Sequence, residues 1–173
     1  GAGVAAVQIN KTITGLAELP KEGYTVSFNI TNTTEGINQT VQISNWDYSE
    51  TNKNWTGSVT AYINLGTGDI ADGTTVTVTE SAPDVSGYEL TPTAGSTEDA
   101  TAIDVALVDG STATANFTNA YTRRTADLTI TKNVDETLAT HIAEQQFSFT
   151  VTGPASLAEA NITDADGTPV DFE

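Results

Sequence analysis

Hydrophobic and polar residues alternate through the stretch VQINKTITG at residues 7–15. Read with the period of two that a β-strand imposes, one face carries three apolar side chains and a lysine: Val7, Ile9, Lys11 and Ile13. The opposite face carries only amides and hydroxyls. Since the apolar face of such a strand points into a core, the lysine at its centre requires an explanation.

Similar alternation recurs along the chain in short runs rich in Thr and Val, which favour strands. The predicted strands cover 4–14, 24–31, 40–46, 55–65, 73–81, 88–92, 101–108 and 111–121. Turn residues separate them, and the Asp109-Gly110 pair predicts a hairpin between the last two runs. Many short strands at this spacing, with no helix required, predict an all-β fold of the immunoglobulin-like β-sandwich class.

Composition limits the partners of this chain of 173 residues. Its net charge is −17 with six basic residues, which excludes the usual nucleic-acid surface and disfavours anionic membranes. No apolar run reaches spanning length, so we expect no membrane insertion in this segment. Cysteine is absent, and an acidic, Thr-rich, Lys-poor β-protein of this kind is more typical of an exported protein held together without disulfides.

The first strand is repeated. Residues 128–135, LTITKNVD, match 7–14, VQINKTIT, at an offset of 121 that aligns Lys132 with Lys11. The same offset aligns the apolar residues of QFSFTV at 146–151 with those of TVSFNI at 25–30. Two strands that match without a gap indicate a repeated structural unit.

The repeat predicts the domain organisation. Residues 1–121 are expected to form a complete sandwich domain, 122–126 a linker, and 127–173 the N-terminal part of a second, truncated sandwich. The offset would place the glutamate and asparagine partners of Lys132 near positions 201 and 240. We therefore expect Lys132 to lack those partners in this chain.

Two other predicted strands carry an inward polar residue. Glu80 continues the apolar face of Val76 and Val78, and Asn119 lies between Phe117 and Tyr121. One interpretation is a buried Lys–Glu ion pair accompanied by a hydrogen-bonded asparagine. The other is chemical, because a desolvated lysine amine is a nucleophile, an Asn carboxamide held against it is an electrophile, and a buried carboxyl can relay protons. That reaction would yield an amide bond and ammonia.

Three motifs in order carry a resemblance to a known family. They are INKTITG in the first strand, VTVTESAPDVSGYEL in the middle and ANFTNAY in the last strand. Residues 5–121 resemble a Gram-positive pilin or adhesin domain of the collagen-adhesin B-type, as in the isopeptide-bonded streptococcal-type pilins. The resemblance implies Lys11 and Asn119 as crosslinked residues and Glu80 as the proton shuttle, with Lys132 as the crosslink lysine of the second copy.

The resemblance also implies a biological setting. It predicts a structural surface module, one link of a pilus shaft or adhesin stalk, that is extracellular on the cell wall or pilus of a Gram-positive bacterium. Its expected partners are other pilin or surface-protein subunits, with host surface ligands as a further possibility. No cofactor or metal is expected, and the self-crosslinking would act once rather than as enzymatic turnover.

Two alternatives remain open at this stage. The chain could be an adhesin domain that binds a host glycan or protein, with Trp46 and Trp55 as a sugar platform, or a plain immunoglobulin-like spacer without a bond. Three smaller features have simpler interpretations. Lys21 is interpreted as a turn lysine rather than a polymerisation site, DADG at 164–167 as a turn rather than a calcium loop, and His141 as neither ligand nor nucleophile.

Overall fold

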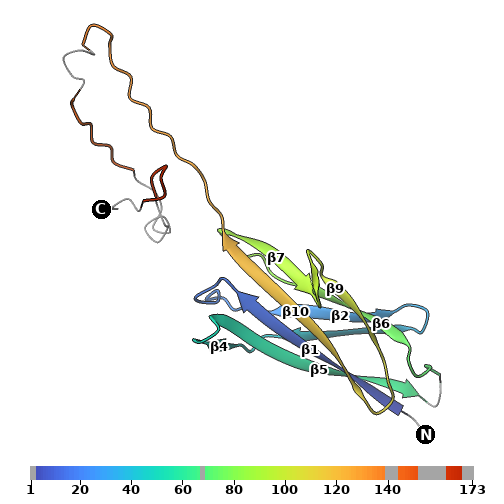
Figure 1. The fold of residues 1–173 in the computed structure, drawn as a ribbon. Helices are drawn as coiled ribbons and strands as arrows, with labels where there is room; N and C mark the ends of the chain where they lie inside the picture. Colours follow the sequence, from blue (N-terminus) through green and yellow to red (C-terminus); the bar gives the residue numbers. More distant parts are fainter. Residues whose placement is uncertain (1–2, 67–68, 139–143, 152–162, 169–173) are drawn as a thin grey trace. The chain divides into compact units, whose positions relative to one another are not determined.

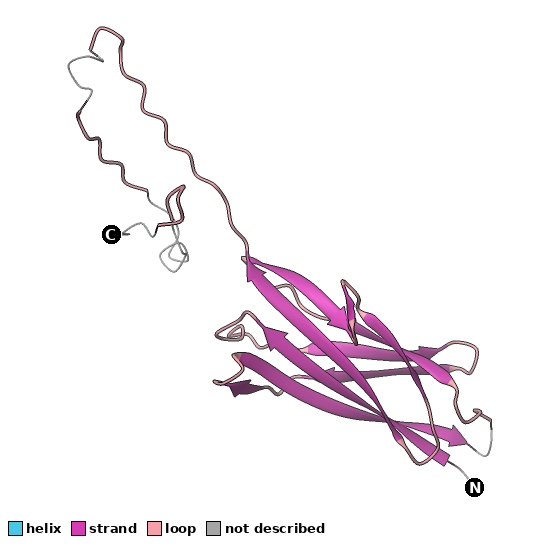
Figure 2. Ribbon diagram, viewed as in Figure 1, coloured by secondary structure: helices cyan, strands magenta, loops and turns pink. Residues whose placement is uncertain are grey.

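The computed structural model describes residues 3–66, 69–138, 144–151 and 163–168. The chain divides into two compact units, Gly1–Asp127 and Leu128–Glu173. Every strand among the described residues belongs to the first unit, as Figures 1 and 2 show. The two units are described separately.

Ten strands build the first unit. They are β1 (Gly3–Thr14), β2 (Val26–Asn32), β3 (Ile37–Ile43), β4 (Asp47–Ser49), β5 (Asn54–Gly66), β6 (Thr75–Ser81), β7 (Tyr88–Ala94), β8 (Thr97–Glu98), β9 (Ala102–Ala106) and β10 (Thr112–Arg123). One sheet has the order β4-β5-β1-β10-β7-β8, and the other has the order β3-β2-β6-β9. The prediction of an all-β sandwich is confirmed.

The first and last strands are neighbours at the centre of the larger sheet. β1 pairs with β10 in parallel and with β5 in antiparallel orientation. All other pairings in both sheets are antiparallel. The N-terminal and C-terminal strands of the domain are therefore hydrogen-bonded to each other.

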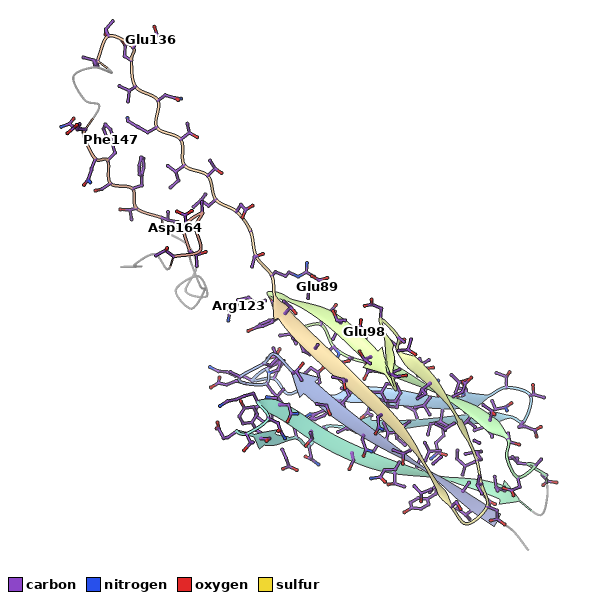
Figure 3. The ribbon with its side chains drawn as sticks, viewed as in Figure 1. Glu89, Glu98, Arg123, Glu136, Phe147 and Asp164 are labelled. Atoms are coloured by element: carbon purple, nitrogen blue, oxygen red, sulfur yellow. The ribbon has the colours of Figure 1, made fainter. Side chains whose placement is uncertain are left out.

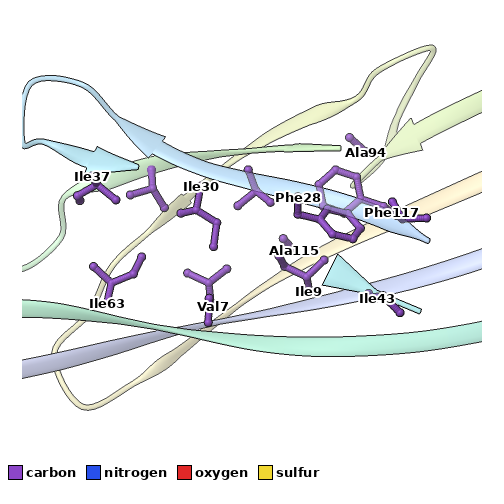
Figure 4. Close-up of a cluster of buried hydrophobic side chains, with 14 of the residues drawn as sticks. Val7, Ile9, Phe28, Ile30, Ile37, Ile43, Ile63, Ala94, Ala115 and Phe117 are labelled. Carbon is purple, nitrogen blue, oxygen red and sulfur yellow. The ribbon is translucent and has the colours of Figure 1, made fainter. Parts of the chain in front are cut away.

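The core lies between the two sheets and uses the inward residues of each strand. Val7, Ile9 and Ile13 of β1 are fully buried, as are Phe28 and Ile30 of β2. Figure 4 shows Val7, Ile9, Phe28 and Ile30 in the space between the sheets, with the rings of Phe28 and Phe117 side by side. Their ring centroids are 5.1 Å apart, so the sheets are in direct contact there.

The hairpin predicted at Asp109-Gly110 is wrong. β9 pairs with β6 in the smaller sheet, whereas β10 lies between β1 and β7 in the larger one. The turn does form, with a hydrogen bond from Ser111 N to Val108 O, but it carries the chain from one sheet to the other. The turn residues Asp and Gly suit a tight hairpin and also suit this connection between sheets. Leu107, which follows β9 at the start of the connection, is fully buried.

Gly15 ends β1 at a point of close approach to β10. Its φ is +86°, and a Cβ there would lie 1.9 Å from the carbonyl oxygen of Tyr121. Only glycine fits both conditions. β10 itself continues to Arg123, so the first two residues of the predicted linker belong to that strand.

The second unit has a different character in its described residues. Most of its large apolar side chains are exposed, including Leu128 at 69% and Phe149 at 53%. The ammonium of Lys132 lies over the ring of Phe147, 5.3 Å from the centroid. Figure 3 labels Phe147 and Asp164 in this unit. DADG forms a turn, since Asp164 accepts hydrogen bonds from the backbone N–H groups of 166, 167 and 168.

Candidate functional site

Three polar side chains are buried among the residues that the structure describes: Lys11, Glu80 and Asn119. The exposed fractions of these residues are 1%, 6% and 0%, respectively. Charged residues are rarely buried this fully unless they are paired, and each buried polar group has a desolvation cost. These three are the residues that the sequence singled out, and the structure places all of them between the sheets.

The strand register brings the three residues to the same part of the core. Lys11 lies opposite Phe117 in the β1–β10 ladder, and Asn119 lies two residues further along β10, opposite Ile13. From the facing sheet, Glu80 on β6 lies opposite Phe28 on β2. Each charged residue therefore has one phenylalanine as its neighbour on the adjacent strand. The rings of Phe28 and Phe117 are in contact with each other, so apolar surface borders the two charges.

Lys11 Nζ is in direct contact with Glu80 Oε2. Within the described residues, neither the ammonium nor the carboxylate forms a hydrogen bond to any other group. A buried ion pair without further hydrogen bonds recovers little of its desolvation cost. The pair is therefore a poor structural device compared with apolar residues of the same size.

Burial pushes both groups towards their neutral forms. Burial lowers the pKa of Lys11 to about 8, and the charge of Glu80 beside it opposes that shift. Burial likewise raises the pKa of Glu80, opposed by Lys11. Transfer of the proton from Lys11 to Glu80 would convert two buried charges into a neutral amine and a carboxylic acid, and burial acts in that direction while the attraction between the two charges opposes it.

Asn119 is held through only one end of its carboxamide. Its Nδ2 donates a hydrogen bond to the hydroxyl of Tyr24 at 3.2 Å. Its Oδ1 is buried and has no hydrogen-bond partner among the described residues. A buried carbonyl oxygen without a partner costs stability, and it remains available to accept a proton or hydrogen bond from an acid.

Sequence reasoning missed two tyrosines beside Asn119. The hydroxyls of Tyr24 and Tyr121 contact each other, and Tyr121 donates to the carbonyl oxygen of Pro83 at 3.0 Å. Both residues are buried, at 2% and 4% exposed. Alternation offered a signal, because Tyr121 follows Asn119 on one face and Tyr24 precedes Val26, but tyrosine at the end of a strand suits either a core or a surface.

The other candidate residues do not contact Lys11, Glu80 or Asn119 through any hydrogen bond or ion pair among the described residues. Trp46 and Trp55 are half-buried against the core, and their indole N–H groups donate to the backbone of Tyr24 and Leu16. Lys21 is exposed in a turn. His141 lies outside the described residues. The described ranges hold no group of three metal-ligating side chains and no helix long and apolar enough to cross a membrane.

The arrangement has the components of an amide exchange. A lysine that can become neutral lies against an acid that can hold its proton, and a carboxamide with a free carbonyl oxygen lies on the strand beside the lysine. All three residues are buried from bulk water, a setting that disfavours hydrolysis as a side reaction. Fixed proximity of this kind replaces a bimolecular encounter by an intramolecular step.

Comparison with protein-family models matches residues 7–122 to the family described as Domain of unknown function (DUF5979). The chain belongs to this family. The matched DUF5979 region contains Lys11, Glu80 and Asn119 and ends within β10. A search of curated proteins finds no match to the chain.

Solved structures similar to this DUF5979 chain include several of a pilus-presented adhesin, Spy0125 (Cpa). A mutant form is 16% identical with a TM-score of 0.33, covering 68% of this chain and 27% of the adhesin chain. A second crystal form is 19% identical with a TM-score of 0.34, covering 66% and 26%. The chain thus spans about a quarter of the length of that adhesin chain.

Proposed function

We propose that the DUF5979 domain is a structural surface module of the collagen-adhesin B-type, locked by an isopeptide bond between Lys11 and Asn119. The observation that carries the proposal is the burial of Lys11, Glu80 and Asn119 together between the sheets. The described core holds three polar side chains, and they are a nucleophile, an acid and an amide. A purely structural role would favour apolar residues at these positions, because the ion pair and the free Asn119 oxygen both cost stability.

The proposed reaction begins with proton transfer from Lys11 to Glu80. The neutral Nζ attacks Asn119 Cγ and forms a new C–N bond, while the Glu80 acid donates a hydrogen bond to Oδ1 and polarises the carbonyl. The Cγ–Nδ2 bond then breaks, and the proton released from Nζ leaves on Nδ2 as ammonia. One amide bond is lost and one is formed, so the step needs no oxidant, metal or cofactor. It occurs once per chain and is not enzymatic turnover.

The position of the bond suits a load-bearing role. β1 and β10 are adjacent parallel strands, so tension between the two ends of the domain would shear their ladder. A covalent bond from Lys11 to Asn119 would carry that tension directly and leave the intervening chain unloaded. By analogy with a disulfide that closes a loop of comparable length, it would stabilise the domain by on the order of 5 kcal/mol.

The proposed setting is a pilus shaft or adhesin stalk on a Gram-positive cell surface. The resemblance of the three motifs to isopeptide-bonded pilin domains supports this setting. So does the sequence, which has no cysteine and a net charge of −17. The partners would be other pilin or surface-protein subunits.

We infer that the second unit begins another module of the same kind, with Lys132 at the place of Lys11. The repeat at an offset of 121 supports this inference. Leu128, Ile130 and Phe149 match core residues of the first unit by sequence, and they are exposed among the described residues.

Protease digestion followed by mass spectrometry tests the bond. The parent should yield one branched peptide in which Lys11 is joined to Asn119 with loss of one ammonia. Glu80→Gln keeps the shape of the side chain but removes the acid, so it should fold and yield the two linear peptides. Glu89→Gln, at an exposed glutamate on β7, is the matched control and should give the branched peptide. Linear peptides from the folded parent would refute the proposal, and branched peptide at the parental level in Glu80→Gln would refute the role of Glu80.

A further inference from the structure

A chain of hydrogen bonds runs from Asn119 to the backbone after β6, and its direction is fixed at the far end. The carbonyl oxygen of Pro83 can only accept, so Tyr121 donates its single hydroxyl hydrogen there, at 3.0 Å. Tyr121 is then left with lone pairs for Tyr24. The contact between the two hydroxyls is therefore a donation from Tyr24 to Tyr121.

The direction of these hydrogen bonds also constrains Asn119. Because Tyr24 has given its hydrogen to Tyr121, it presents only lone pairs to the carboxamide. Asn119 must meet those lone pairs with a donor, which is its NH₂ group, and the observed contact joins Nδ2 to the Tyr24 hydroxyl at 3.2 Å. The carbonyl oxygen Oδ1 is thereby turned away from Tyr24, and it has no other partner among the described residues.

The tyrosines are well placed to hold this direction. Burial raises the pKa of both hydroxyls, so both keep their hydrogens at neutral pH. The Tyr24 ring packs edge-on against Trp46 and Tyr121, with centroids 5.6 and 6.1 Å away. Its backbone carbonyl accepts the indole N–H of Trp46 at 2.7 Å. The ring therefore has little freedom to move away from Asn119.

We propose that Tyr24 and Tyr121 are positioning residues that set which end of the Asn119 carboxamide faces the acid. The carbonyl oxygen of Pro83 accepts the hydroxyl hydrogen of Tyr121, and the Tyr121 oxygen accepts that of Tyr24. The Tyr24 oxygen then accepts a hydrogen bond from the Asn119 NH₂ group. The Asn119 carbonyl oxygen is then left free to accept a hydrogen bond from the acid, and the NH₂ group stays on the Tyr24 hydroxyl until attack at Cγ. This inference rests on the proposed crosslink between Lys11 and Asn119.

The directional chain makes an unusual prediction for the two tyrosines. In Tyr24→Phe the Asn119 NH₂ group loses its hydrogen-bond acceptor and the carboxamide can adopt either orientation, so the crosslinking rate should fall about twofold. In Tyr121→Phe, Tyr24 loses its acceptor and can donate to Asn119 Oδ1 instead. The amide is then held in the wrong orientation, and the rate should fall at least about fivefold, the ratio that one net hydrogen bond supports.

The double variant separates orientation from packing. Removing Tyr24 as well eliminates the wrong donor, so Tyr24→Phe/Tyr121→Phe should react faster than Tyr121→Phe alone and recover the rate of Tyr24→Phe. A packing role predicts the opposite, since two lost hydroxyls would be worse than one. Tyr88→Phe is the matched control, because Tyr88 packs edge-on against Tyr121 but its hydroxyl, among the described residues, accepts from Arg123 and forms no hydrogen bond with Tyr24 or Asn119. It should react at the parental rate.

Rates are measured on chain purified in denaturant, shown by intact mass to be unreacted, and refolded by dilution. Loss of ammonia is then followed by mass spectrometry. In parallel, the Glu80→Gln background keeps the folded chain unreacted for nuclear Overhauser measurements. The contacts between the Asn119 NH₂ protons and the Tyr24 ring protons should be present there and lost when Tyr121→Phe is added.

Four outcomes are separated by this design. Slower reaction in Tyr121→Phe with recovery in the double variant, and loss of the Overhauser contacts, would support the inference. A double variant slower than Tyr121→Phe, or equal rates in all variants of a parent that crosslinks, would overturn it. Contacts that persist in the Tyr121→Phe background would also overturn it. A parent that folds and never loses ammonia would instead refute the proposed crosslink itself.

Discussion

The strand at residues 7–14 and the stretch at 128–135 share one sequence pattern, yet their lysines have opposite surroundings. Lys11 is 1% exposed and contacts Glu80 from the facing sheet. Lys132 is exposed and lies over the ring of Phe147. The apolar neighbours differ in the same way, since Ile9 is fully buried and the matching Ile130 is 48% exposed.

The difference shows which property belongs to the strand and which to the fold. The alternating pattern places a lysine among apolar positions in both stretches, but among the described residues only the first stretch forms a strand. The facing sheet desolvates Lys11 by covering it, and the carboxylate of Glu80 that contacts Lys11 comes from that sheet. The burial of Lys11 is therefore a tertiary property of the complete sandwich, whereas the same motif in the described residues of the second unit carries an exposed lysine.

The largest expected difference between the two regions is in amide hydrogen exchange. The β1, β2 and β10 amides are hydrogen-bonded within a closed core, whereas those of 128–134 and 144–151 lie outside the described strands. We expect exchange in the second set to be roughly a thousandfold faster or more, because core amides open only with much of the fold. Mass-detected exchange on the monomer measures this, and equal protection of both sets would contradict the comparison.

Replacement of the lysine should lower the thermal stability of the first unit only when Lys11, and not Lys132, is replaced. Lys11→Met removes the proposed crosslink and leaves Glu80 without its partner, so it should lower Tm by roughly 15–30 °C, corresponding to on the order of 5 kcal/mol. The matched Lys132→Met should leave the Tm of the first unit unchanged. Calorimetry measures both, and similar Tm values for the two variants would contradict the account.

A second change tests whether the loss comes from one bond. Asn119→Ala removes the other half of the proposed crosslink, so the double variant with Lys11→Met should melt close to the single variants. Additive losses of Tm would indicate two independent packing defects instead.

Gly15 tests the close approach of β1 to β10, which has no counterpart in the repeat because Glu136 occupies the matching position. Gly15→Ala should lower the free energy of unfolding by about 3 kcal/mol or more, since its Cβ would meet the Tyr121 carbonyl oxygen at 1.9 Å. Gly23→Ala also has positive φ but no atom within 4 Å, so it should lose only about 1 kcal/mol. Urea titration compares them, and equal losses would show that the crowding is relieved.

The pH dependence of stability separates free from crosslinked Lys11. In Asn119→Ala the amine remains free, with its pKa lowered in the folded chain to about 8 from 10.5. Between these values the unfolded chain binds more protons, so stability should rise with pH, by roughly 2 kcal/mol from pH 8 to 9.5. The crosslinked parent carries an amide at this position and should lack that rise. A parent and variant with the same slope in urea titrations would contradict the assignment.

Sequence alone predicted the sandwich and the inward placement of three polar residues, because strand alternation is a local property. Lys11, Glu80 and Asn119 each interrupt an apolar face, which makes them visible without a structure. The crossing at Asp109-Gly110 was not predictable, since the same turn residues serve a hairpin or a change of sheet. The chain from Asn119 through Tyr24 and Tyr121 to Pro83 was also missed, because it joins side chains and a backbone carbonyl that are distant in sequence.

The mass of the intact protein under denaturing conditions tests the central claim most directly. The folded parent, denatured just before measurement, should weigh one ammonia less than its sequence, and Lys132→Met should show the same deficit relative to its own sequence. Lys11→Met and Asn119→Ala should each have their full sequence mass. A parent with full sequence mass after complete folding would contradict the account.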